Sequence, residues 1–161
     1  MWNEEFQSRF NDFYAKKLKA DYPDVTVNWL LTPNQGSAYQ DKLDEYLLAQ
    51  DKAKADDKID IFLVEADYAL KYVDTDYTLD VKSDVGLTDS DVSQMYKYTK
   101  DIMTDSKGNL KGVSWQACPA GFIYRRSFAR KVLGTEKPEE VQAQLDTWDK
   151  FDAVAAKMKA S

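Results

Sequence analysis

The stretch Gly112-Val-Ser-Trp-Gln-Ala-Cys-Pro-Ala-Gly-Phe-Ile-Tyr-Arg-Arg126 organises the interpretation of the whole chain. Residues 110–114 alternate apolar and small polar side chains, and residues 122–124 resume the β-prone run. Pro119 and Gly121 interrupt the pattern between the two. The stretch therefore predicts two short strands on either side of a kink, where the chain can pass from one lobe to another.

The chain before this stretch alternates helical and β-prone segments. Aromatic and apolar residues recur at helical spacing over residues 3–20, where Asn3 can cap the first turn, and a second helix is expected to begin after Ser37. The apolar runs 25–31 and 59–64 predict buried strands. Strands that alternate with helices favour an α/β fold with a largely parallel sheet flanked by helices.

The acid-rich segment 74–91 raises the question of calcium. An EF-hand loop needs a glycine at its sixth position and an acid at its twelfth. Counted from the first residue of the segment, these positions hold Leu79 and Val85, so we expect no metal site. Thr88 and Asp91 instead fit a capping box that starts a helix.

The carboxyl-terminal part is predicted to be helical. Gly134 is suited to stop a helix that begins near Ser127, and Pro138 suits the first turn of another. Thr147 can cap a last helix. The apolar face of this last helix holds Trp148, Phe151, Val154, Ala155 and Met158.

Composition excludes several classes of protein. The chain has 161 residues, a formal charge of -6 and no histidine, and its lysines are scattered among acids, so we expect no nucleic-acid partner. The single Cys118 has no partner for an internal disulfide and no histidine for a catalytic pair. No nucleotide-binding glycine motif and no suitably placed pair of carboxylates occurs. We therefore expect no enzyme and no cofactor.

A wider set of motifs points to a family. Lys111 to Ser127, followed by Gly134 and by Asp146-Thr-Trp-Asp-Lys-Phe151, resembles the extracellular solute-binding proteins of ABC importers, in particular the sugar-binding group. In that family a Gly-Val-x-Trp-Gln strand runs into a Tyr-Arg strand that crosses the hinge, and a Thr-Trp-Asp-x-Phe helix start follows.

The resemblance implies that the chain is the amino-terminal part of a longer, two-lobed parent. Residues 1–120 would form an α/β lobe that lacks most of its first strand, and residues 121–161 the hinge crossing and the first helices of an incomplete second lobe. The parent would be extracellular, as a membrane-anchored lipoprotein or in the periplasm. It would close over a small-molecule ligand, a sugar, and deliver it to a membrane permease.

The expected ligand-binding residues lie where strands are predicted to end, because ligands of open α/β sheets collect beyond the carboxyl ends of strands. Aromatic faces and nearby polar groups at such a place suit a sugar. The resemblance agrees, since it implies ligand contacts from the loops after the first and third strands and from this segment next to the hinge. The expected set is Trp2, Asn3, Glu4, Glu65, Asp67, Trp115 and Gln116. Structural alternatives exist for three of them: Trp2 could pack on the sheet, and Asn3 and Asp67 could cap helices.

Other functions remain open at this point. The chain could serve as a sensory or interaction module that presents the lobe to a protein partner, could bind peptides or polyamines, or could belong to an enzyme whose catalytic site lies elsewhere. The unfinished second lobe also predicts that the isolated chain self-associates or leaves its last helices mobile, since its apolar faces lack partners.

Overall fold

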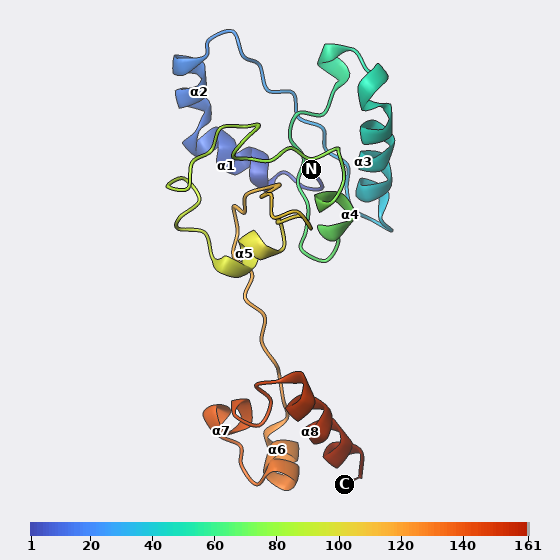
Figure 1. The fold of residues 1–161 in the computed structure, drawn as a ribbon, viewed down its shortest axis with the longest axis vertical. Coiled ribbons are helices and arrows are strands. Elements are labelled where there is room, and N and C mark those ends of the chain that lie inside the picture. Colours follow the sequence, from blue (N-terminus) through green and yellow to red (C-terminus); the bar gives the residue numbers. More distant parts are fainter. Residues whose placement is uncertain (161) are drawn as a thin grey trace. The chain divides into compact units, whose positions relative to one another are not determined.

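The computed structural model describes residues 1–160, and its contacts divide the chain into two compact units, Met1–Ala117 and Cys118–Ser161. The first unit contains α1 (Glu5–Phe13), α2 (Ala15–Asp21), α3 (Ala38–Ala49), two short 3-10 turns (Gln50–Lys52 and Ala55–Asp57), α4 (Leu70–Val73) and α5 (Lys97–Asp101). The second contains α6 (Arg126–Leu133), α7 (Pro138–Gln142) and α8 (Trp148–Ala160) (Figure 1). The interpretation of these units as lobes of a binding protein stays a prediction.

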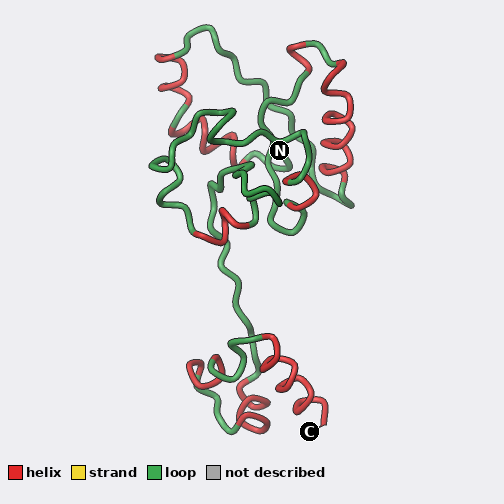
Figure 2. Tube along the Cα trace, in the orientation of Figure 1, coloured by secondary structure: helices red, strands yellow, loops and turns green. Residues whose placement is uncertain are grey.

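The predicted α/β fold with a largely parallel sheet is wrong. Within residues 1–160 the structure has helices joined by irregular segments and no sheet (Figure 2). The segments expected as strands, 25–31, 59–64 and 122–124, are not paired into strands, and segment 110–114 contributes only an isolated antiparallel bridge from Leu110 to Thr104.

Side-chain hydrogen bonds explain part of this difference. The Gln50 side chain donates from Nε2 to the Ile59 carbonyl over 2.9 Å and accepts at Oε1 from the Ile59 amide over 3.0 Å. The Tyr39 hydroxyl donates to the Leu63 carbonyl over 2.7 Å. These bonds use backbone groups that a neighbouring strand would need. Side-chain hydrogen bonds thus hold the β-prone residues 59–64 in place of backbone hydrogen bonds to a neighbouring strand.

One pair of hydrogen bonds joins Met1 to residues 30–32. The Met1 amino group donates to the Leu30 carbonyl over 2.9 Å, and the Thr32 amide donates to the Met1 carbonyl over 2.9 Å. Such slanted bonds to alternate residues are those of parallel neighbours. The pairing does not continue along segment 25–31, whose Val25 and Leu31 side chains are exposed.

The expected helix over residues 3–20 forms as two helices that meet at Tyr14. The backbone of Tyr14 lies outside helical geometry, with φ at −123° and ψ at −27°. Its amide still donates to the Phe10 carbonyl over 2.8 Å, and its ring meets the Phe10 ring edge-on at 5.4 Å. The periodicity therefore predicted the helical segment but not the break.

The first unit has two hydrophobic clusters, built from residues before and after segment 74–79 in the sequence. The larger one joins α3 to α4 and is built from Tyr39, Leu43, Leu47, Tyr68 and Tyr72, with Trp2, Phe62 and Val64 packed against it. The smaller one consists of Val81, Val92 and Leu110, with Leu87, Met95 and Met103 around them. The apolar face predicted after Ser37 is buried as expected at Tyr39, Leu43 and Leu47.

Local signals placed the helix ends of the second unit correctly. Gly134 follows α6 in a left-handed conformation with φ at 74°, and Pro138 occupies the first turn of α7. At the start of α8 the Lys150 amide donates to Thr147 Oγ1 over 3.3 Å. Phe122 stacks on Phe151 of α8 with ring centroids 5.3 Å apart.

Candidate ligand-binding site

The residues predicted to bind a ligand fall into two groups within the first unit. One group lies against α1 and includes Trp115 and Gln116. The other lies near α3 and α4 and includes Glu65 and Asp67. Segment 2–4 connects them, because Trp2 contacts Tyr39 of α3 and Asn3 hydrogen-bonds to the first residue of α1.

Trp115 rests on α1 with part of its surface open. Its ring meets Phe6 edge-on, with centroids 5.4 Å apart and planes at 76°. The Arg9 guanidinium lies 5.8 Å from the centre of the same ring, a cation–π distance. Because 36% of Trp115 remains exposed, the indole is both held in position and accessible.

Further aromatic rings support this contact from behind. Trp29 lies half-buried against both aromatic residues of α1, 6.2 Å from Phe6 and 5.3 Å from Phe10. Edge-to-face pairs of this kind each contribute about 0.5–1.5 kcal/mol beyond the area they bury. The cluster therefore fixes α1 and Trp115 relative to each other, although the expected strand containing Trp29 does not form.

Polar groups border the same cluster. The Gln116 side chain donates from Nε2 to Glu5 Oε1 over 3.3 Å, and that oxygen also accepts from Arg9 Nη2 over 3.0 Å. Asn3 Oδ1 accepts from the Glu5 amide over 3.0 Å, and the Glu4 side chain is exposed beside it. An amide, a guanidinium and carboxylates thus lie next to the open indole.

The second group surrounds two buried tyrosines. Trp2 meets Tyr39 edge-on, with centroids 5.3 Å apart and planes at 74°. Burial raises the pKa of Tyr39 to about 12. Burial also raises the pKa of Tyr68, and the Glu65 and Asp67 carboxylates add to the rise. Both predicted acids therefore lie close to Tyr68.

Tyr68 differs from its neighbours in the same core. Its hydroxyl is buried and makes no hydrogen bond within the described part of the chain. The Tyr72 hydroxyl, by contrast, donates to Asp44 Oδ1 over 2.9 Å. Hydroxyl groups buried without a partner are uncommon and destabilising.

The residues that sequence reasoning missed are those that hold the predicted ones. Glu5, Phe6 and Arg9 lie under Trp115 and Gln116, and Tyr39 lies beside Trp2. Helical spacing of Glu5 and Arg9 was a local signal for their ion pair. No local pattern reports the contact of Gln116 with Glu5, which are 111 positions apart.

The side chains gathered at this place suit the binding of a ligand. Within residues 1–160 no group of three or more histidine, cysteine, aspartate or glutamate side chains is arranged to hold a metal ion. What the two groups offer is aromatic surface, carboxylates and side-chain amides. Such a combination recognises a polar solute that also has apolar faces.

Residues 14–161 match the family model described as bacterial extracellular solute-binding protein, and the chain belongs to this family. No curated protein and no solved structure matches the chain. Members are extracellular or periplasmic proteins that bind a small-molecule solute, typically without catalysis, and work with a transporter. The resemblance drawn from segment 111–127 is thus confirmed at the level of a solute-binding protein. Among the helices of residues 1–160, none has the length and apolar character needed to cross a membrane.

Proposed function

We propose that the chain is the amino-terminal part of the substrate-binding subunit of an ABC importer that captures a carbohydrate outside the cell. The observation that carries this proposal is the position of Trp115, whose ring is held edge-on by Phe6 while 36% of the residue stays exposed. The apolar face of a sugar ring packs on an indole held in this way. The family supplies the broader class, an extracellular solute-binding protein.

The polar groups near Trp115 support a ligand rich in hydroxyl groups. Gln116 and Glu5 are joined to each other and exposed, and Asn3 lies one residue before the exposed Glu4. Carboxylates accept hydrogen bonds from sugar hydroxyls, whereas side-chain amides both donate and accept. On the other side of segment 2–4, Glu65 and Asp67 would extend the polar surface toward Tyr68.

The proposed mechanism needs no covalent chemistry. The protein closes two lobes over the sugar and delivers it to a membrane permease. The division of the chain into two compact units supports this mechanism. The full-length protein would be a membrane-anchored lipoprotein or a periplasmic protein.

A thermal-shift screen of the full-length protein against monosaccharides and oligosaccharides is the first test, because a ligand that binds only the native state raises the melting temperature. The second test is titration calorimetry of Trp115→Ala with the best sugar of that screen. We expect the affinity to fall about tenfold, which corresponds to about 1.4 kcal/mol.

Trp148→Ala is the matched control, since this tryptophan is 75% exposed and belongs to the second unit. The control should bind the sugar like the wild type. If Trp115→Ala binds the sugar with unchanged affinity, Trp115 does not contact the sugar. If no sugar raises the melting temperature and a peptide raises it clearly, the solute is a peptide and not a carbohydrate.

A further inference from the structure

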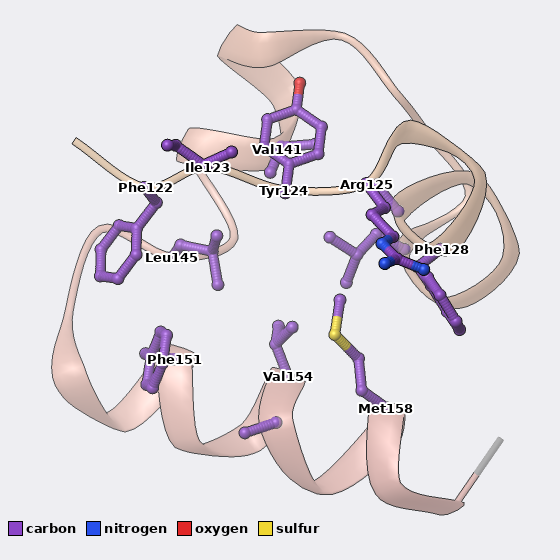
Figure 3. A pocket seen from close by; sticks show the side chains of 13 residues that line it. Phe122, Ile123, Tyr124, Arg125, Phe128, Val141, Leu145, Phe151, Val154 and Met158 are labelled. Carbon is purple, nitrogen blue, oxygen red and sulfur yellow. The ribbon is translucent and has the colours of Figure 1, made fainter.

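The Tyr68 hydroxyl is the one side-chain polar group of residues 1–160 that is buried and has no hydrogen-bond partner. Tyr68 as a whole is 8% exposed. Tyr124 shows the usual situation: its hydroxyl points away from the apolar hollow among α6, α7 and α8 (Figure 3) and donates to the Glu136 carbonyl over 3.0 Å. Because a buried hydroxyl without a partner lowers stability, the one on Tyr68 calls for a group that is not part of the described chain.

The Tyr68 ring is fixed by packing in the larger hydrophobic cluster of the first unit. Its centroid lies 6.4 Å from that of Tyr72, and the two ring planes meet at 78°. Tyr39 and Leu43 of α3 belong to the same cluster, and Ala69, the next residue in the chain, is 1% exposed. The hydroxyl is therefore in position before a ligand arrives, which lowers the entropy lost on binding.

An exposed turn with two carboxylates lies beside this hydroxyl. Residues 65–67 are exposed, and the Tyr68 amide closes the turn by donating to the Glu65 carbonyl over 3.2 Å. Burial raises the pKa of Tyr68, and the carboxylates of Glu65 and Asp67 add to the rise, so the phenol stays protonated at neutral pH. Within the described residues neither carboxylate has a hydrogen-bond donor or an ion-pair partner.

These groups together fit one kind of ligand group. A protonated phenol can donate a hydrogen bond, whereas a carboxylate only accepts. A sugar hydroxyl does both, so it can bond to Tyr68 and to a carboxylate at the same time. An anionic group would be repelled by Glu65 and Asp67, and Lys71, the nearest cation in the sequence, is already paired with Asp44.

We propose that one hydroxyl group of the bound sugar displaces turn 65–67, accepts a hydrogen bond from Tyr68 and donates one to the Glu65 carboxylate. This inference rests on the proposed function and adds to it a residue that determines specificity. The site takes an uncharged hydroxyl at this position and rejects a sugar that has an acid group there. The Tyr68 hydroxyl is already out of water, so the new hydrogen bond replaces none to solvent.

The test uses the full-length protein and the best sugar of the thermal-shift screen. Tyr68→Phe should weaken the binding of that sugar about fivefold in titration calorimetry, because the ring stays and only the donor is lost. The melting temperature without sugar should stay the same or rise. A residue with a purely structural role would not combine lower affinity with unchanged or higher stability.

Tyr72→Phe is the matched control. Tyr72 belongs to the same cluster, but its hydroxyl already donates to Asp44 Oδ1 over 2.9 Å. This variant should have a lower melting temperature without sugar and should bind the sugar like the wild type.

Monodeoxy analogues of the same sugar identify the hydroxyl that Tyr68 contacts. One analogue should bind the wild type at least fivefold more weakly than the parent sugar does. For this analogue the loss should be smaller in Tyr68→Phe, since both changes remove the same hydrogen bond. The other analogues should lose the same affinity in both proteins.

The results that contradict the proposal differ from those that contradict the proposed function. If a sugar binds Tyr68→Phe and the wild type alike, Tyr68 makes no contact with it, and the proposed function stands. Equal losses of affinity in Tyr68→Phe and Tyr72→Phe would show a general disturbance of the cluster. If every monodeoxy analogue loses the same affinity in both proteins, Tyr68 does not bond to a sugar hydroxyl. If no sugar binds, the proposed function is wrong, and this inference with it.

Discussion

The Tyr39 hydroxyl donates a hydrogen bond of 2.7 Å to the Leu63 carbonyl and so joins α3 to the extended segment 59–64. Tyr39 is 4% exposed, and the same ring supports Trp2 from the side. This bond lies in the middle of the larger core, between a helix that the sequence predicts well and a segment that it predicts badly.

Tyr39→Phe should destabilise the chain by about 1–2 kcal/mol, because it leaves the Leu63 carbonyl without its donor. The measurement is the free energy of unfolding in urea. Tyr46→Phe on the same helix is the control, since its ring lies on the partly exposed side beneath Lys42. Equal losses in both variants would show that the hydrogen bond contributes nothing.

Tyr68→Phe should leave the stability unchanged or raise it, the opposite of Tyr39→Phe. The Tyr68 hydroxyl is buried and has no hydrogen-bond partner within residues 1–160, so its removal relieves a desolvated polar group. The measurement is the melting temperature of Tyr68→Phe, compared with those of the wild type and of Tyr39→Phe. A loss of stability as large as that of Tyr39→Phe would mean that the hydroxyl has a partner after all.

Stability should depend on pH through Asp105. Burial acts to raise the pKa of the Asp105 carboxyl, but hydrogen bonds from Asn109 and Lys107 outweigh it, so the pKa lies below its ordinary value. The three bonds measure 2.8 to 2.9 Å. Because the folded pKa is lowered, the carboxylate stabilises the fold above its unfolded pKa of about 3.9. This contribution is lost as the pH falls through the folded pKa.

The test compares unfolding in urea at neutral pH and at a pH below 3. The free energy of unfolding should differ less between the two pH values in Asp105→Asn than in the wild type. In Asp12→Asn, which changes a surface acid of α1, the difference should be that of the wild type. A carbon-detected titration of the Asp105 carboxyl gives its pKa directly. A value at or above that of an unfolded aspartate would contradict the prediction.

Removing divalent cations should not change the melting temperature. In segment 74–91 the carboxylates bind the protein itself: Asp80 accepts from the amides of Lys82 and Ser83, and Asp91 accepts from Thr88. Asp84 accepts from the Asp80 amide over 2.9 Å. Scanning calorimetry with and without EDTA is the measurement. A drop of several degrees on adding EDTA would reveal a structural metal ion.

Helices with local signals could be predicted from the sequence. The spacing of Tyr39, Leu43 and Leu47 gave both α3 and its buried face. Thr88 and Asp91 form the expected reciprocal bonds, yet the helix expected to begin there is reduced to α5, five residues long. A capping box favours a helix start but does not propagate the helix.

The sheet and the site depend on contacts that the sequence pattern does not report. Residues 25–31 and 59–64 have high β-propensity, but that property becomes a strand only when another strand pairs with it. The same limit applies to Trp115: its neighbours Phe6 and Arg9 are far away in the chain. Sequence reasoning therefore named Trp115 and Gln116 without naming what holds them.

Gln50 acts as a substitute peptide group for the β-prone segment 59–64. Its primary amide donates to and accepts from Ile59, as a residue of an adjacent strand would. A strand from another molecule that approaches this position must first displace both hydrogen bonds. Ile61, which is 82% exposed, would otherwise be part of an open edge that invites intermolecular pairing. A single neutral side chain of the same unit therefore gives this apolar segment local protection against aggregation.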